Sequence, residues 1–139
     1  MKVTLNYSEN LHFQASARHF SDIPLDEPET FHGKDLGPSS IEYVLIGIGG
    51  CLGTTFVFCL QKHNIEIKFL QVIVNGTLKH IGPKDRLKLI KIEIQFEIDL
   101  AEETSIEDFE FCKTEFTEFC PLNDIIKSGI PLNVRIIKK

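Results

Sequence analysis

The sequence predicts an α+β fold in which a mostly antiparallel sheet surrounds one long apolar helix. Segments with alternating apolar and polar residues, the pattern of half-buried strands, occur before and after this helix. Residues 43–60 include no charged residue, so a helix there has no charged face to expose to solvent. We therefore expect other parts of the protein to bury it on all sides. Two shorter helices are predicted late in the chain. The expected element order is β-β-α-β-β-α-α-β.

Length and charge limit the classes of protein to consider. A chain of 139 residues favours a single domain over residues 1–139, large enough for a hydrophobic core. The formal net charge is -5 and the chain contains no basic block, which argues against nucleic acid as a partner. The first residues show no secretory signal, so we expect a cytoplasmic protein with reduced cysteines.

The uncharged stretch also satisfies the length test for a membrane span. Four glycines and two threonines dilute its hydrophobicity, and amphipathic segments flank it. We therefore expect a core helix and no membrane association.

The chain begins with two predicted antiparallel strands. Val3, Leu5 and Tyr7 alternate with polar residues, and the same pattern runs from Leu11 to about Phe20 after a turn. Residues 21–38 contain many prolines, glycines and acidic residues, which predicts an irregular loop.

Local signals mark the start of the central helix. Pro38 precedes Ser39, and Glu42 follows three residues later, so the serine and the glutamate can cap each other's free amides. The helix is expected to continue to Lys62. Its glycines suit close packing against another backbone, either within the chain or in a second copy.

A long hairpin is predicted next. The alternation slips by one residue after Phe69 and again near Ile90, and such slips indicate β-bulges. The segment from Ile81 to Asp85 is the clearest turn, and Asn75-Gly76 predicts a further turn or irregularity.

Two helices and a strand complete the predicted order. Thr104 or Ser105 caps the first helix, and Cys120 and Pro121 begin the second. The apolar face of the first helix is expected to contain Ile106, Phe109, Cys112, Phe116 and Phe119. Leu132, Val134 and Ile136 predict a final strand.

The four cysteines differ in local setting. Cys120 has the strongest local argument for reactivity, because free amides at a helix start lower a thiol pKa, although it also suits a plain N-cap. Cys51 lies mid-helix, where no helix end assists it, so a reactive thiol there requires a cation or donor from elsewhere; otherwise it is a small buried apolar residue. Cys59 and Cys112 are expected in the core.

No metal or cofactor is predicted. Cysteine spacing shows no zinc pair, and the glycines near Cys51 lie inside a helix instead of forming a phosphate loop. The histidines likewise show no metal-binding spacing; they are His12, His19, His32, His63 and His80.

Several motifs together resemble those of the OsmC/Ohr family of osmotically inducible and organic hydroperoxide resistance proteins. They are an acid-proline loop at 26–28, the segment 33–45, Gly49-Gly50-Cys51, and Phe119-Cys120-Pro121-Leu122. The resemblance implies an intertwined homodimer with each central helix buried between sheets. It also implies thiol-dependent reduction of organic hydroperoxides, which protects against oxidative stress.

The resemblance also assigns roles to individual residues. Cys51 would be the peroxidatic nucleophile and Cys120 the resolving thiol, with a lipoyl or thioredoxin-like dithiol as reductant. Glu42 matches the acidic residue of the site, and Arg18 is the candidate for the thiolate-stabilising arginine, which no motif fixes. The sequence departs from the family pattern at two positions. Ser40 occupies a position where many members have proline, and His32 occupies one where glycine is common.

A second hypothesis belongs to a different class of protein. In it the chain is a non-enzymatic member of the family that binds an apolar small molecule at the dimer interface. The distance between the sulfurs of Cys51 and Cys120 distinguishes the two hypotheses, because a two-cysteine mechanism requires them within reach of a disulfide.

Overall fold

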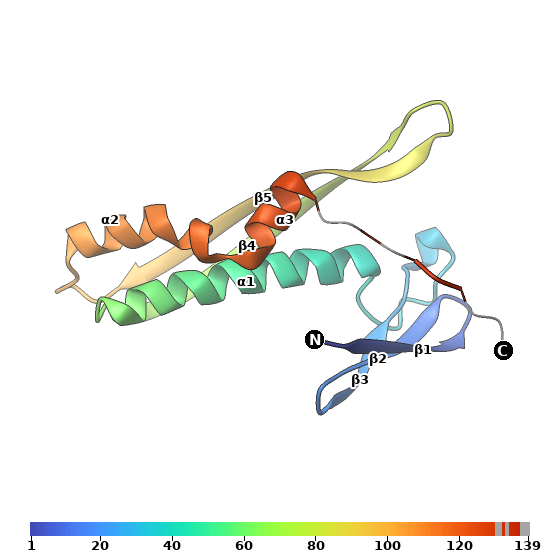
Figure 1. Cartoon of the computed structure of the whole chain (residues 1–139), viewed down its shortest axis with the longest axis horizontal. Helices are drawn as coiled ribbons and strands as arrows, with labels where there is room; N and C mark the ends of the chain where they lie inside the picture. The colour runs from blue at the N-terminus through green and yellow to red at the C-terminus, as the bar shows by residue number, and fades with distance from the viewer. Residues whose placement is uncertain (130–131, 133, 137–139) are drawn as a thin grey trace. The chain divides into compact units, whose positions relative to one another are not determined.

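The computed structural model describes residues 1–129, 132 and 134–136. They form two compact units, Met1–Gly47 and Ile48–Lys139, and each is described by itself. Helices and antiparallel sheets occur together, which confirms the α+β class (Figure 1). A single domain over the whole chain stays a prediction.

The first unit contains a three-stranded antiparallel sheet in the order β1-β2-β3. The strands are β1 (Val3–Glu9), β2 (His12–Ala17) and β3 (Phe20–Leu25). The first two confirm the prediction, but β2 ends before Phe20. Arg18 and His19 form a tight turn there, because Ala17 pairs with Phe20 across the hairpin.

Strand β3 corrects the prediction of an irregular segment from residue 21. Pro24 argued against a strand because it has no amide hydrogen for a ladder. However, β3 lies at the edge of the sheet, where a proline leaves no partner unsatisfied. The rest of the segment contains a short 3-10 turn, η1 (Glu29–Phe31).

One buried carboxylate orders the loop after β3. Asp26 has no exposed surface and accepts hydrogen bonds from the N–H groups of Glu27 (2.8 Å), Lys34 (3.0 Å) and Leu36 (3.3 Å). His32 has a φ of 68°, the left-handed conformation that glycine adopts most easily. A glycine would adopt this conformation at a lower cost than His32 does.

The central helix α1 (Ser40–Lys62) begins with the predicted capping box. The N–H of Ser39 donates to Oε2 of Glu42 at 2.7 Å, and the N–H of Glu42 donates to Oγ of Ser39 at 3.3 Å. The Tyr43 hydroxyl donates to the Pro24 carbonyl at 2.6 Å and thereby joins the end of β3 to the first turn of α1.

The second unit contains the predicted long hairpin, formed by β4 (Ile67–Ile81) and β5 (Arg86–Leu100). Each strand contains a bulge: Ile90 is the extra residue on β5, as predicted, and Lys68 is the extra residue on β4, just before Phe69 and not after it. The turn before Arg86 is confirmed as well. Asn75-Gly76 is not a turn, because both residues pair with β5 inside the continuous ladder.

Two helices follow, α2 (Ile106–Glu115) and α3 (Pro121–Ser128), separated by a 3-10 turn, η2 (Phe116–Phe119). Ser105 is the N-cap of α2 and accepts from the N–H of Asp108. Contrary to the prediction, Ile106 and Phe119 are 78% and 71% exposed. Ile106 is the first residue of α2, and the change to 3-10 geometry ends the α-helical spacing before Phe119.

The predicted last strand is not seen at the described residues. Leu132, Val134 and Ile136 have no regular secondary structure. Residues 130, 131, 133 and 137–139, over which the prediction also extends, lie outside the described part of the chain.

Two apolar clusters join the helices of the second unit to its hairpin, and Figure 1 shows α1 running alongside β4 and β5. Phe56 and Leu60 of α1 pack with Ile65 and Cys112 in one cluster, and Ile48 and Leu52 pack with Cys120 in the other. Alternate residues of β5 complete both clusters, as the period-2 pattern predicts: Ile92, Ile94, Phe96, Ile98 and Leu100.

The single chain does not cover α1 on all sides, contrary to the expectation from its composition. Val44, Ile46 and Phe58 are 49%, 58% and 59% exposed. By length and hydropathy α1 alone qualifies as a possible membrane span among the described residues, with a third of its most apolar window buried. Its buried residues pack against the hairpin through the two apolar clusters.

Candidate functional site

The structure brings Cys51 and Cys120 together, although they are far apart in the sequence. Cys51 lies in the middle of α1, and Cys120 is the N-cap of α3. Their sulfur atoms are 2.6 Å apart. A disulfide between them therefore requires only a small movement of the side chains.

The two thiols differ in their access to solvent. Cys120 is 2% exposed and packs with Ile48 and Leu52, whereas Cys51 is partly exposed. A molecule approaching this pair from solvent reaches the sulfur of Cys51 more easily. This difference agrees with the order of attack that the resemblance implies.

Burial raises the pKa of the Cys51 thiol, and the adjacent Cys120 thiol raises this pKa further. The backbone N–H of Leu122 acts in the opposite direction because it donates a hydrogen bond to the Cys51 sulfur. Leu122 is the second residue of α3, where amides lack a partner within the helix. The start of α3 thus supplies a donor for a thiolate on Cys51.

The Leu122 amide is a donor from another element, which a reactive thiol at Cys51 was expected to require. The local sequence assigned the free amides of α3 to Cys120, which does begin that helix. In the structure Cys120 makes no side-chain capping bond, and an amide of the same helix points to Cys51 instead. The local advantage attributed to Cys120 therefore belongs to Cys51.

Comparison with known families agrees with these features. The sequence model described as OsmC-like protein matches residues 32–135, about three-quarters of the chain, including α1, the hairpin and both cysteines. The chain belongs to the OsmC-like family. No curated protein sequence matches it at a significant level.

Solved structures of OsmC-like proteins share the fold. An OsmC-like protein from Mycoplasma pneumoniae has a TM-score of 0.75 at 20% identity, with 91% of this chain and 86% of that chain covered. The organic hydroperoxide resistance protein OhrB of Bacillus subtilis has a TM-score of 0.60 at 16% identity, with 92% and 90% covered. An organic hydroperoxide resistance protein from Legionella pneumophila has a TM-score of 0.63 at 12% identity, with 92% and 89% covered.

Two further residues were assigned to the site from the OsmC-like resemblance, and both belong to the first unit. Glu42 forms the capping box of α1, and its hydrogen bonds from the N–H and hydroxyl of Ser39 lower its pKa. Arg18 occupies the turn between β2 and β3, with its guanidinium 5.3 Å from the centre of the Phe20 ring. The catalytic roles of both residues stay predictions.

The structure of this OsmC-like protein also contains a disulfide that sequence analysis did not predict. Cys59 of α1 and Cys112 of α2 form a disulfide, whereas all four cysteines were expected to be reduced. Both lie in or against the core as predicted. His63 is four residues after Cys59 on the same side of the helix, and this spacing was the signal that sequence analysis missed.

Proposed function

We propose that this protein is a thiol-dependent reductase of organic hydroperoxides. The observation that carries the proposal is the 2.6 Å separation of the Cys51 and Cys120 sulfurs, with the Leu122 amide directed at Cys51. The organic hydroperoxide resistance proteins among its structural relatives support the choice of substrate.

The reaction begins at Cys51, the more exposed sulfur. Its thiolate attacks the terminal oxygen of a hydroperoxide, the O–O bond breaks, and the other oxygen leaves with a proton as an alcohol. Cys51 is then a sulfenic acid. Cys120 attacks this sulfur, an S–S bond forms, and the sulfenic oxygen leaves as water.

The resting thiols return by exchange with a dithiol. A lipoyl group or a thioredoxin-like protein supplies two electrons and two protons and becomes a disulfide itself. The exposed edge of Cys51 makes it the sulfur that this reductant reaches most easily. A cytoplasmic location, which we also propose, provides such reductants.

Arg18 is our candidate for the cation that assists ionisation of Cys51. Burial and the neighbouring thiol keep the pKa of Cys51 raised even though the Leu122 amide acts to lower it. A nearby positive charge would lower this pKa further and so increase the fraction of reactive thiolate. A guanidinium stays charged at every physiological pH.

We propose that the protein acts as a homodimer. The exposed apolar side chains of α1 support this, since a helix this apolar gains stability when a second copy covers it. Gly50 adds to the argument, because outside its own stretch of helix no atom of the described residues lies within 4 Å of the position that a Cβ would occupy there. The backbone at this point is open to close approach by another helix.

A peroxidase assay tests the proposed function. The reduced protein is mixed with cumene hydroperoxide and a dithiol reductant, and peroxide loss is followed for the wild type, Cys51→Ser and Cys120→Ser. We expect turnover by the wild type and none by Cys51→Ser. When the dithiol is left out, we also expect a sulfenic acid on Cys51 to accumulate in Cys120→Ser, where a dimedone adduct detected by mass spectrometry reports it.

Matched measurements exclude other sources of activity. Mass spectrometry of the treated wild type should show a two-proton loss that maps to the Cys51 and Cys120 peptides. Peroxide consumption by Cys51→Ser at the wild-type rate, or unchanged Cys51 and Cys120 thiols after treatment, contradicts the proposal. The second outcome leaves the non-enzymatic binding protein as the better hypothesis.

A further inference from the structure

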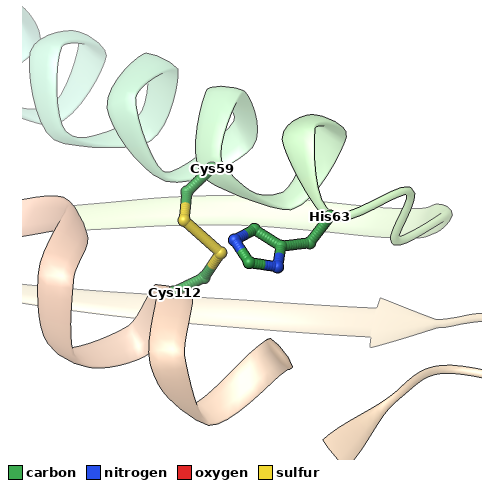
Figure 2. A group of neighbouring side chains, drawn as sticks. All are labelled: Cys59, His63 and Cys112. Atoms are coloured by element: carbon green, nitrogen blue, oxygen red, sulfur yellow. A yellow bond between two sulfur atoms is a disulfide. The ribbon is translucent and has the colours of Figure 1, made fainter. Parts of the chain in front are cut away.

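A second group of reactive side chains lies at the far end of α1, eight residues after Cys51. Cys59 lies in the last turn of α1, His63 follows directly after the helix ends at Lys62, and Cys112 faces them from α2 (Figure 2). The two sulfurs and a ring nitrogen of His63 lie within 4.8 Å of one another. Figure 2 shows the imidazole beside the two sulfur atoms.

A carboxylate fixes the orientation of the imidazole. Nδ1 of His63 is 2.8 Å from Oδ1 of Asp108, which leaves Nε2 as the ring nitrogen free for another ligand. Asp108 and Cys112 are four residues apart on α2, so α2 contributes two groups to this cluster, and the C-terminal end of α1 with the residue after it contributes the other two. A carboxylate bound to the second nitrogen of a histidine is a common feature of zinc sites.

The surroundings of the cluster favour a cation. The cluster lies at the C-terminal end of α1, where the helix dipole is negative, and acidic residues dominate the first turn of α2. The nearby lysines are directed elsewhere. Lys113 is 2.7 Å from Glu110, and Lys62 lies over the Phe58 ring.

We propose that Cys59, Cys112 and His63 form a Zn²⁺ site when the disulfide is reduced. Two thiolates and one imidazole are a preferred ligand set for zinc, at about 2.3 Å for sulfur and about 2.0 Å for nitrogen. In the disulfide form the two sulfurs and the His63 nitrogen lie within 4.8 Å of one another, so after reduction the sulfurs need only move apart to admit the ion. Water takes the fourth position from the solvent side, where the His63 side chain is 31% exposed.

Reduction of the Cys59–Cys112 disulfide allows Zn²⁺ to bind, and oxidation of the two thiolates releases it. A dithiol gives two electrons and two protons to the Cys59–Cys112 disulfide, and Zn²⁺ then replaces the two thiol protons. In the reverse direction a hydroperoxide takes two electrons from the thiolates and, with two protons, leaves as alcohol and water. The disulfide forms again and Zn²⁺ is released.

Asp108 is a positioning residue in this site. It holds Nε2 of His63 toward the sulfurs, so Asp108→Asn should weaken zinc binding by about 10-fold to 100-fold without removing a ligand. Asp108→Glu should recover part of the affinity. A merely structural role for Asp108 would alter stability and leave the zinc affinity of the folded protein unchanged.

Zinc retention by the full chain tests the proposal. Cys51→Ser is used as the background so that the Cys51 and Cys120 pair cannot bind the metal together. The protein is reduced with a phosphine, incubated with Zn²⁺ and desalted, and bound zinc is measured by mass spectrometry. We expect about one zinc per chain after reduction and none in the oxidised protein.

Ligand variants and a spectroscopic probe complete the experiment. Cys112→Ser and His63→Gln should lose the metal, whereas His80→Gln, at a distant histidine, should retain it. Co²⁺ in place of Zn²⁺ should give the visible bands of a tetrahedral site with thiolate charge transfer. Reduced protein that retains no zinc, or zinc retention that survives the loss of Cys112 and of His63, overturns the proposal. The comparison of oxidised with reduced protein needs no variant at this site and therefore stands even if a variant misfolds.

Discussion

The backbone N–H of Leu122 acts to lower the pKa of the Cys51 thiol, although 71 positions separate the two residues. This amide is free because it lies in the first turn of α3. The contact joins the start of one helix to the middle of another at the proposed reaction centre. It offers Cys51 the stabilisation that local sequence assigned to Cys120.

Replacing this amide by an ester should slow the reaction of Cys51. Leucic acid in place of Leu122 removes the N–H and keeps the side chain, so the pKa of Cys51 rises and the thiolate fraction at neutral pH falls. A hydrogen bond to a charged group is worth about 1.5–3 kcal/mol, so we expect at least about a tenfold loss in rate. Stopped-flow measurement of sulfenic acid formation checks this.

The same exchange at Asn123 is the matched control. Its N–H belongs to the same first turn but bonds to the Cys120 carbonyl at 3.0 Å. The ester there should leave the rate nearly unchanged. Equal losses for both esters would mean that α3 has been loosened and that the Leu122 contact has no special role.

The pH dependence of Cys51 oxidation should show a raised pKa. Burial and the Cys120 thiol both act to hold the pKa above the ordinary 9.0. The thiolate is the reactive form, so the rate should rise with pH through the alkaline range. If Arg18 assists ionisation, Arg18→Gln moves this rise to higher pH, while Arg18→Lys retains most of the effect. An unchanged profile in Arg18→Gln removes Arg18 from the site.

Sequence analysis predicted those features that depend on short segments. The Ser39 and Glu42 capping box and the bulge at Ile90 follow from patterns within a few residues, and the bulge of β4 lies close to its predicted place. The Asn75-Gly76 turn was wrong because a long ladder with β5 overrides local turn preference. Strand β3 was missed because its position at a sheet edge, which tolerates Pro24, is a property of the whole sheet.

Sequence analysis named residues of the candidate site, but it did not predict the contacts between them. The resemblance named Cys51 and Cys120, but the direction of the Leu122 amide depends on how α3 meets α1. The Cys59–Cys112 disulfide joins residues 53 positions apart and follows from the packing of α2 on α1. Periodicity places a residue on a face of a helix, and it does not specify which residue of another helix lies opposite.

Phe56 should be a major source of stability in the second unit. Its side chain is 3% exposed and packs against the rings of Phe96 and Phe116, with centroids 5.4 Å and 4.9 Å away. Phe56→Ala should lower the free energy of unfolding by about 3–5 kcal/mol through lost burial and a cavity. Urea unfolding followed by far-UV circular dichroism measures this, since the chain has no tryptophan.

Phe119→Ala is the control for Phe56, because Phe119 is 71% exposed. We expect a change within about 0.5 kcal/mol, as at other surface positions. Similar losses at the two positions would show that an interaction outside the described chain buries Phe119.

Two adjacent glycines of α1 should respond differently to a large side chain. A Cβ at Gly49 would lie 2.7 Å from Cγ2 of Val74, whereas one at Gly50 meets no atom within 4 Å. Gly49→Leu should therefore disrupt packing on β4, and Gly50→Leu should leave the single chain folded. If α1 meets a second copy near Gly50, sedimentation should show a dimer for the wild type and a folded monomer for Gly50→Leu. A monomeric wild type contradicts the proposed homodimer.

Asp26 should stabilise the loop of the first unit in a pH-dependent way. Burial alone raises the pKa of its carboxyl group, but three backbone N–H donors outweigh burial and hold the pKa below the ordinary 3.8. A lowered folded-state pKa means that the stabilisation is complete above the unfolded-state pKa and is lost as pH falls through the folded value. Asp26→Asn should thus be clearly less stable at neutral pH. The difference from wild type should shrink in acid, where Asp26 itself becomes neutral.

Amide hydrogen exchange at Lys34 and Leu36 measures this effect directly, because both N–H groups donate to Asp26. Both should exchange faster in Asp26→Asn at neutral pH, since an amide oxygen is a weaker acceptor than a carboxylate. Glu29→Gln removes an exposed acidic group from the same loop and should leave both rates unchanged. Equal protection in Asp26→Asn and the wild type would show that backbone geometry alone orders the loop.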